Sequence, residues 1–175
     1  MPKFNVHTEF DPLTHVVMGI GQGYHRIPEL VEIANSTHQK TVDTSGDPSE
    51  VQFMLEFAAF QVALEGHGVR VHQPVMAADT VQDQTCPRGI GFVIGDTFVA
   101  AGMRFAGRRD EIEGLDGVLE AFDGPIVSVP QGLCLEGGDV LVHGKVILVG
   151  CGARSDPEGA AFLAAMFPDH RVVAV

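Results

Sequence analysis

The most informative segment of the chain is Leu133-Cys134-Leu135-Glu136-Gly137-Gly138-Asp139, which runs directly into the apolar residues Val140-Leu141-Val142. A carboxylate, Glu136, stands immediately before two glycines. Because glycine has no Cβ, backbone at such a position turns tightly and approaches a ligand closely. The segment therefore predicts an acidic ligand-binding loop that leads into a buried strand.

The strand that begins at Val140 is the first arm of a predicted hairpin. Its second arm is Val146-Ile147-Leu148-Val149, and His143-Gly144-Lys145 connects the two. A helix opened by Asp156-Pro157 follows, and Val172-Val173-Ala174-Val175 begins a further strand. The sequence thus predicts a strand–strand–helix–strand (ββαβ) unit from residue 140 to the last residue.

The same unit occurs once before this one, where Gly91–Ile94 and Thr97–Ala100 flank the turn Gly95-Asp96. A constant offset superposes the two hairpins and places Phe92 on Val140. The helix of the earlier unit is expected to carry one apolar face, and its last strand is Ile126–Val129. A ββαβ unit that recurs at this spacing is typical of a radial or stacked array. The residues of that apolar face are Ile112, Leu115, Val118, Leu119 and Phe122.

A still earlier copy of the unit is incomplete. A strand is expected at His15–Ile20, and a second strand begins at Val69. Between them, Asp47, Pro48 and Glu50 predict the cap, first turn and capping box of a helix. The segment 21–46 shows no clear period apart from a possible helical turn at 29–34, which suggests a long functional loop. The expected apolar face of the helix is Val51, Leu55, Ala58 and Val62, widened by Phe53, Phe57 and Phe60, and the polar loop residues that can touch a ligand are His25, Arg26, His38 and Lys40.

The bulk properties limit the possible partners. The chain has 175 residues, a net charge of −12 and 45% hydrophobic residues, which fits one globular domain and argues against nucleic acid or an anionic membrane as partner. Three cysteines without a CxxC pair form no disulfide framework, and no apolar run is long enough to span a bilayer. We expect a cytoplasmic protein with no metal and no cofactor.

The superposition that places Phe92 on Val140 also aligns the loops that precede the two hairpins. It puts Arg88 on Glu136 and Gly89 on Gly137. Equivalent loops of a radial array face the same axis. The sequence therefore predicts that Arg88 and Glu136 point into one shared site.

Three stretches resemble the pentein, or guanidino-group-modifying, superfamily. They are Leu135–Val140 followed by Val149-Gly150 and Arg154, the segment Cys86–Asp96, and the opening Phe10–Val17. The superfamily includes arginine deiminases, dimethylarginine dimethylaminohydrolases and amidinotransferases. The resemblance implies a five-bladed α/β propeller of ββαβ units, of which residues 1–175 form one domain. This domain is expected to be the N-terminal portion of the propeller, incomplete, with two and a half to three of the five blades.

The resemblance also implies covalent catalysis on a guanidinium carbon. A Cys thiolate attacks, a His protonates the departing amine, and an acid binds the guanidinium through charged hydrogen bonds. Glu136 matches that acid, and Asp83 stands where several members have a substrate-facing Asp or Asn. Arg154, and one of Arg108 or Arg109, match arginines that hold the substrate carboxylate in the dimethylargininase branch.

Two departures from the family pattern matter for function. The family usually reads Arg-Asp where this chain has Arg88-Gly89, so Gly89 removes an acidic substrate anchor. The family's catalytic His and Cys fall after the strand that begins at Val172, outside these 175 residues. We therefore expect the guanidinium-binding half of a site, without turnover by this chain alone.

Three functions remain open at this point. The first is a hydrolase acting on arginine or a methylated arginine, with a small cationic guanidino compound as ligand. The second is an amidinotransferase. The third is a non-catalytic binding or structural chain, because an incomplete propeller leaves an open edge and an apolar seam that favour a homo-oligomer or pairing with a complementary chain.

Overall fold

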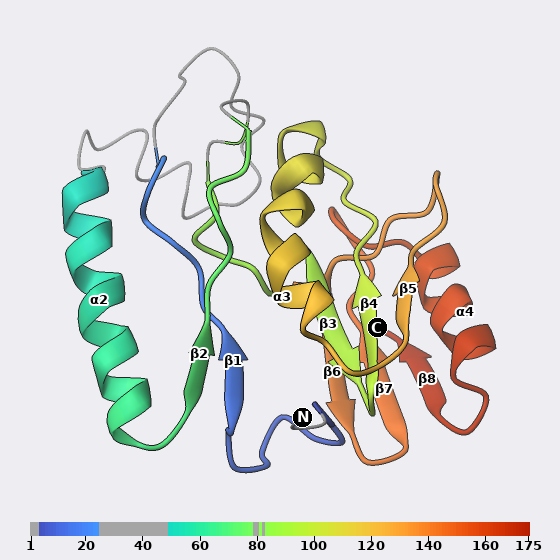
Figure 1. Ribbon diagram of the computed structural model, residues 1–175. Coiled ribbons are helices and arrows are strands. Elements are labelled where there is room, and N and C mark those ends of the chain that lie inside the picture. Colours follow the sequence, from blue (N-terminus) through green and yellow to red (C-terminus); the bar gives the residue numbers. More distant parts are fainter. Residues whose placement is uncertain (1–3, 25–48, 79–80, 82) are drawn as a thin grey trace.

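The computed structural model describes residues 4–24, 49–78, 81 and 83–175. These residues form a mixed α/β fold in which small sheets and helices succeed one another along the chain (Figure 1). None of the sheets in the described part closes into a ring, so the number of blades stays a prediction. The strands are β1 (His15–Val17) and β2 (Arg70–His72) in the first sheet, β3 (Gly91–Ile94), β4 (Thr97–Ala100) and β5 (Ile126–Ser128) in the second, and β6 (Val140–His143), β7 (Val146–Val149) and β8 (Arg171–Ala174) in the third.

The second and third sheets share one topology, which confirms the two predicted ββαβ units. In each sheet an antiparallel hairpin is followed by a helix and then by a strand that pairs parallel with the second arm of the hairpin. Each hairpin turns at a glycine with positive φ, 58° at Gly95 and 57° at Gly144. A residue with a Cβ is strained in that conformation, which explains glycine at both turns.

The strand pairing in the two hairpins shows that the superposition suggested by the sequence is wrong by one position. The pairs that close the turns are Ile94↔Thr97 and His143↔Val146, so Ile94 corresponds to His143. A one-position shift exchanges the two faces of a strand. Phe92 therefore corresponds to Leu141 rather than to Val140.

Helix α4 (Pro157–Met166) covers the third sheet. Asp156 caps it, as predicted, by accepting a hydrogen bond at Oδ1 from the N–H of Gly159 (2.8 Å). Leu163 and Ala160 of the helix and Ile147 of β7 belong to the same buried apolar cluster. Burying a leucine or isoleucine side chain stabilises a fold by about 1.5–3 kcal/mol, so this helix–sheet contact anchors the unit.

The helix of the second unit is only partly α-helical. A 3₁₀ helix, η1 (Ala106–Leu115), leads into the short α3 (Asp116–Glu120). The predicted apolar face is confirmed, since Leu115 is buried in a second cluster with Phe98, and the other members pack against it. The 3₁₀ form puts residues three apart above one another, which matters for the site described below.

Helix α2 (Glu50–Gly66) differs from the prediction in both its cap and its apolar face. Ser49, not Asp47, is the N-cap, and its Oγ accepts from the N–H of Gln52 (3.2 Å). With Ser49 as the cap, Glu50 is the first residue of the helix rather than the third, where a capping box needs its acid, and its carboxylate accepts from the N–H of Gly23 (2.8 Å). The helix therefore begins two positions later than the sequence suggested.

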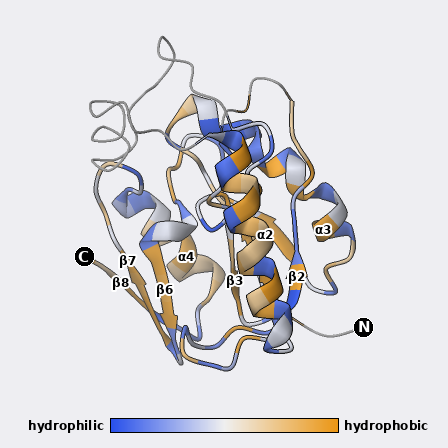
Figure 2. Cartoon of the chain, turned by 90° about the vertical axis from the view of Figure 1, so that its left-hand side faces the viewer, coloured by the Kyte–Doolittle hydropathy of each residue, from blue (hydrophilic) through white to orange (hydrophobic). Residues whose placement is uncertain are grey.

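No residue of α2 is buried, and its predicted core face is largely in solvent. Phe53 and Phe57 are half-buried, whereas Leu55, Phe60 and Val62 are 67%, 55% and 69% exposed. Figure 2, which views the molecule from the side of α2, shows hydrophobic positions on the outward side of this helix. The sequence prediction failed because α2 is apolar on all sides and its sheet has two short strands that cover only one of them.

Some sequence predictions lie outside the described residues. They concern the possible helical turn at 29–34 and the loop residues His25, Arg26, His38 and Lys40. Within the described ranges, no helix is both long and apolar enough to cross a membrane.

The capping contacts of Asp156 yield a prediction for stability. Besides capping α4, its Oδ2 accepts from the N–H of Cys134 (3.2 Å), which ties the helix to the Glu136 loop. We expect Asp156→Ala to lower the free energy of unfolding by about 1–2 kcal/mol. Asp156→Asn keeps an acceptor for the helix N–H, so its loss is expected to be smaller. Urea unfolding measures both, and an Ala variant as stable as the wild type would contradict the assignment.

Candidate functional site

Glu136 lies at the junction of the second and third units. The residue before it, Leu135, forms a β-bridge with Gly102 of the second unit and is fully buried. The residue after it, Gly137, begins a 3₁₀ turn, and a Cβ there would lie 2.2 Å from the carbonyl oxygen of Arg88. The loop therefore needs a glycine to pack this closely. As a result, the Glu136 side chain is 1% exposed.

A buried hydroxyl fixes the backbone of Glu136. The N–H of Glu136 donates to Oγ of Ser155 (3.0 Å), and the Ser155 hydroxyl donates to Asp139 (2.6 Å). Asp139 thus braces its own loop through Ser155, which the sequence analysis missed. Ser155 lies next to Arg154 and just before the helix cap, and that position was the only sequence signal for it.

The carboxylate of Glu136 is buried without a full set of partners. Among the described residues, neither of its oxygens accepts a hydrogen bond of good geometry. The backbone of Arg104 lies near enough to lower the pKa of Glu136 slightly, but not enough to offset burial. The closest cation is Nη1 of Arg154, 3.6 Å from Oε2. Burial raises the pKa of Glu136, and the charges of Arg154 and Arg108 only partly oppose it. A buried carboxylate in this state favours a bound donor.

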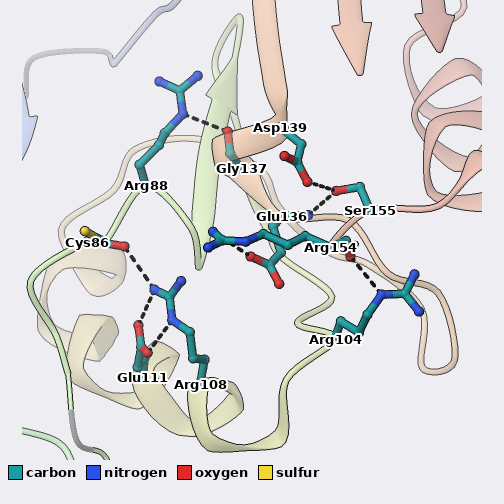
Figure 3. A network of polar contacts seen from close by, with 10 residues as sticks. All are labelled: Cys86, Arg88, Arg104, Arg108, Glu111, Glu136, Gly137, Asp139, Arg154 and Ser155. Carbon is teal, nitrogen blue, oxygen red and sulfur yellow. Dashed lines mark hydrogen bonds and ion pairs between the residues drawn. The ribbon is translucent and has the colours of Figure 1, made fainter. Parts of the chain in front are cut away.

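Arg108 is held beside this acid by Glu111. The guanidinium donates from Nε to Oε1 (2.7 Å) and from Nη2 to Oε2 (2.8 Å) of Glu111, which is 1% exposed (Figure 3). Burial alone lowers the pKa of Arg108, but the bonds and charge of Glu111 outweigh burial and raise it, with smaller contributions from Asp83 and Glu136. Glu111 was missed in the sequence. Its only signal is the i, i+3 spacing, which aligns it with Arg108 on a 3₁₀ helix.

Asp83 adds a further negative charge to the group. Its Oδ1 accepts from both the N–H (2.8 Å) and the hydroxyl (2.6 Å) of Thr85, which fixes its orientation. Its charge acts on both Arg108 and Glu111. The structure thus brings together four predicted residues, Asp83, Arg108, Glu136 and Arg154, and one that was not predicted, Glu111.

The prediction that Arg88 and Glu136 share a site is wrong. Arg88 points away from Glu136 in Figure 3, donating to the carbonyls of Gly137 (2.9 Å) and Val140 (2.7 Å). Its guanidinium also forms a two-point ion pair with Glu9 (3.0 and 3.2 Å). Arg88 therefore joins the N-terminal segment to the third unit.

The misplacement of Arg88 has a structural cause. The equivalent bridge residues of the two loops are Gln84, paired with Ile20, and Leu135, paired with Gly102. The first loop continues from Gln84 to the start of β3 at residue 91, whereas the second runs only from Leu135 to the start of β6 at residue 140. The first loop is therefore the longer one. A constant offset cannot align loops of different length.

Arg109, another predicted substrate residue, donates to the backbone carbonyls of Met103 and Arg104 (both 3.2 Å). It therefore supports its own loop. Arg154, which the sequence analysis expected to hold a substrate carboxylate, lies beside Glu136. Within the described residues, no cluster of three or more His, Cys, Asp or Glu side chains has the geometry of a metal site.

Comparison with known proteins finds solved structures with a similar fold. No family model and no curated protein sequence matches the chain. An inosamine-phosphate amidinotransferase from Streptomyces griseus matches 97% of this chain with a TM-score of 0.76 at 19% identity. A dimethylarginine dimethylaminohydrolase from Pseudomonas aeruginosa matches 93% with a TM-score of 0.70 at 18% identity.

A third similar structure is the N-terminal domain of a cyanobacterial arginine dihydrolase, which matches 91% of the chain with a TM-score of 0.74 at 19% identity. All three belong to the superfamily that the sequence motifs suggested. The chain has the pentein fold. It spans 62%, 61% and 56% of the lengths of these three penteins, respectively.

The raised pKa of Glu136 yields a prediction for the stability of this chain. A carboxyl with a raised folded-state pKa destabilises the fold once pH exceeds the unfolded pKa, near 4.3 for glutamate, and most fully above the folded pKa. Glu136→Gln should therefore be more stable than the wild type at pH 7, whereas the two should converge below about pH 4.

Urea unfolding at pH 4 and pH 7 measures the effect, with Glu120→Gln on the exposed end of α3 as control. A Glu136→Gln variant less stable than the wild type at pH 7 would contradict the assignment. So would a stability difference that does not change with pH.

Proposed function

We propose that this chain binds the guanidino group of a small ligand at Glu136, as part of a protein that modifies such groups. The observation that supports this best is the buried Glu136 carboxylate, which lacks well-aligned hydrogen-bond donors among the described residues. A guanidinium presents N–H donors in a planar fork that matches a carboxylate in shape and charge. Binding would supply both the missing hydrogen bonds and a positive charge.

The surroundings of Glu136 suit this ligand class. The Arg154 contact at 3.6 Å is longer than a charged hydrogen bond, which spans about 2.7–2.9 Å, so it leaves Glu136 under-coordinated. The hydrogen bond to Ser155 fixes the backbone of Glu136 and leaves its carboxylate oxygens able to accept hydrogen bonds from a ligand. A site of this kind gives up folding stability for binding, a common feature of functional sites.

The reaction class is the finer part of the proposal. A hydrolase acting on arginine or a methylated arginine agrees with the Glu136–Asp139 motif and Arg154. An amidinotransferase is the alternative, and solved structures of both classes share the fold. By the resemblance, the nucleophilic Cys and the His acid fall outside these 175 residues, so the purified 175-residue polypeptide is expected to bind without turnover.

Binding and turnover can be measured on the same preparation. In titration calorimetry we expect the polypeptide to bind agmatine and arginine, and Glu136→Gln to lose affinity by about tenfold or more. Glu120→Gln is the matched control. Citrulline formation from arginine should be absent. Unchanged binding in Glu136→Gln would refute the site, and citrulline release would mean that one of Cys86, Cys134 and Cys151 is a working nucleophile.

Self-association is a second candidate property, and one observation favours it. The cross-strand pair Phe92–Val99 of the second sheet is buried in the cluster formed with the third unit. The equivalent pair of the third sheet, Leu141–Leu148, is 41% and 37% exposed. We propose that a second copy of the chain covers this face, which gives a homodimer.

Light scattering tests this proposal. Wild-type protein should be dimeric at micromolar concentration, and Leu148→Lys should be monomeric because it places a charge at the centre of the interface. Leu13→Lys, at another exposed apolar residue, is the control. A stable wild-type monomer would contradict the proposal.

A further inference from the structure

The side chain of Arg88 clamps the turn that follows Glu136. Its Nε donates to the carbonyl of Gly137 (2.9 Å), and its Nη2 donates to the carbonyl of Val140 (2.7 Å). One of these carbonyls belongs to the first residue of the 3₁₀ turn Gly137–Asp139, and the other to the residue just after it. Figure 3 shows the bond to Gly137, with the guanidinium directed away from Glu136. Arg88 therefore holds the loop of Glu136 from the side opposite to the carboxylate.

Backbone contacts join the same two loops. The N–H of Gly137 donates to the carbonyl of Gly89 (3.0 Å), and this N–H belongs to the peptide unit that Glu136 begins. Gly89 itself lies against Arg108, because a Cβ on it would be 2.9 Å from Nη1 of that arginine. The peptide after Glu136 is thus held by a tightly packed neighbour. The next peptide is held through its carbonyl by Arg88.

Glu9 fixes the position of the Arg88 fork. Its carboxylate accepts from both Nη atoms of Arg88 (3.0 and 3.2 Å) and from the N–H of Val142 (3.3 Å). Burial alone would raise the pKa of Glu9, but the hydrogen bonds and charge of Arg88 outweigh burial and lower it, with a smaller contribution from Val142. All three guanidinium nitrogens of Arg88 thus donate to acceptors of the protein.

The N-terminal segment that carries Glu9 lies across the turns of both hairpins. The backbones of Val6 and Gly95 exchange two hydrogen bonds (2.8 and 2.7 Å). The N–H of Gly144 donates to the carbonyl of His7 (2.8 Å). Because both units anchor the segment, the fold gives the carboxylate of Glu9 a fixed place.

We propose that Glu9 and Arg88 are positioning residues of the guanidinium site, which hold the carboxylate of Glu136 in the orientation that binds the ligand. The proposal rests on guanidinium binding at Glu136 as proposed above, and adds two residues that do not touch the ligand. Ser155 fixes the N–H of Glu136 on one side, and Arg88 fixes the turn on the other. A guanidinium presents its N–H groups as a planar fork, so a small displacement of the carboxylate costs affinity.

The contacts require an arginine at 88 rather than any cation. Three nitrogens in one plane reach two carbonyls of the turn and the carboxylate of Glu9, which the single ammonium of a lysine cannot do. The alternative explanation is that Arg88 contributes only its positive charge. Arg88→Lys separates the two explanations, because it keeps the charge and loses the clamp.

Calorimetric titration of the 175-residue chain with agmatine tests the proposal. Arg88→Gln is expected to lower the affinity about tenfold, and Arg88→Lys nearly as much, because the carboxylate is displaced. Glu9→Gln keeps one acceptor and should lower it only about two- to fivefold, as a half-exposed ion pair allows. The double variant Glu9→Gln/Arg88→Gln should lose no more than Arg88→Gln alone, since Glu9 acts through Arg88. Arg171→Gln, at an exposed position of the edge strand β8, should bind like the wild type.

The pH dependence of binding separates positioning from a general loss of stability. The affinity falls as Glu136 takes up a proton, so its decrease in acid reports the pKa of Glu136 in the free protein. Burial raises that pKa in the wild type. Arg88→Gln frees the carboxylate to move toward solvent, so the decrease should shift to lower pH, toward the ordinary glutamate value of about 4.3. The charges of Arg154, Arg108 and Asp139, which act on Glu136, are the same in both proteins.

The outcomes separate this inference from the proposed function. If folded Arg88→Gln or Arg88→Lys binds agmatine like the wild type while Glu136→Gln does not, the guanidinium site stands and positioning by Arg88 is overturned. An unshifted pH dependence contradicts it as well. Losses that add in the double variant would overturn the role of Glu9.

Circular dichroism shows whether each variant is folded. If Arg88→Gln does not fold, Arg88→Lys and Glu9→Gln carry the test, and wild-type affinity in both would overturn the proposal. If the wild type binds no guanidino compound, both proposals fail together.

Discussion

The burial of one carboxylate, that of Glu136, is the constraint on which the rest of the site depends. A buried carboxylate persists only where backbone, packing and charge compensate for its lost hydration. The hydroxyl of Ser155 fixes its backbone, Leu135 fills the core beside it, and Arg154 supplies part of the countercharge. Each of these comes from the stretch of chain that builds the third unit. The fold and the site therefore depend on the same few residues.

The site lies between the second and third units because Glu136 stands on the loop that connects them. The residue before Glu136 pairs with Gly102 of the second unit, and the turn after it packs against the loop of Arg88 and Gly89. Arg88 then ties that loop to Glu9 from the beginning of the chain. Three segments distant in sequence converge on one loop, so its geometry is over-determined. Such rigidity is what a binding site for a small planar cation needs.

The two buried acids of the site, Glu111 and Glu136, differ in how fully they are paired with a cation. The Arg108–Glu111 pair is closed on itself by two short hydrogen bonds. Glu136, in contrast, forms a single ion pair within the described residues, the longer contact to Arg154. Because the first pair is already satisfied, it acts as a fixed feature of the site, whereas Glu136 retains capacity for a ligand. Two buried acids, both 1% exposed, therefore differ in how fully their charge is paired.

The sequence by itself determined the ββαβ repeat, the glycine turns, the cap at Asp156 and the acid at 136, because period, turn chemistry and motif are local properties. It misplaced Arg88 and missed Ser155 and Glu111. It also assigned the aromatic face of α2 to a core. Only the tertiary structure decided these points. Loop lengths differ between repeats, so contacts such as Arg88–Glu9 and Gly89–Arg108 join residues that no periodicity relates. Which side of an apolar helix is covered depends on how many strands lie beside it.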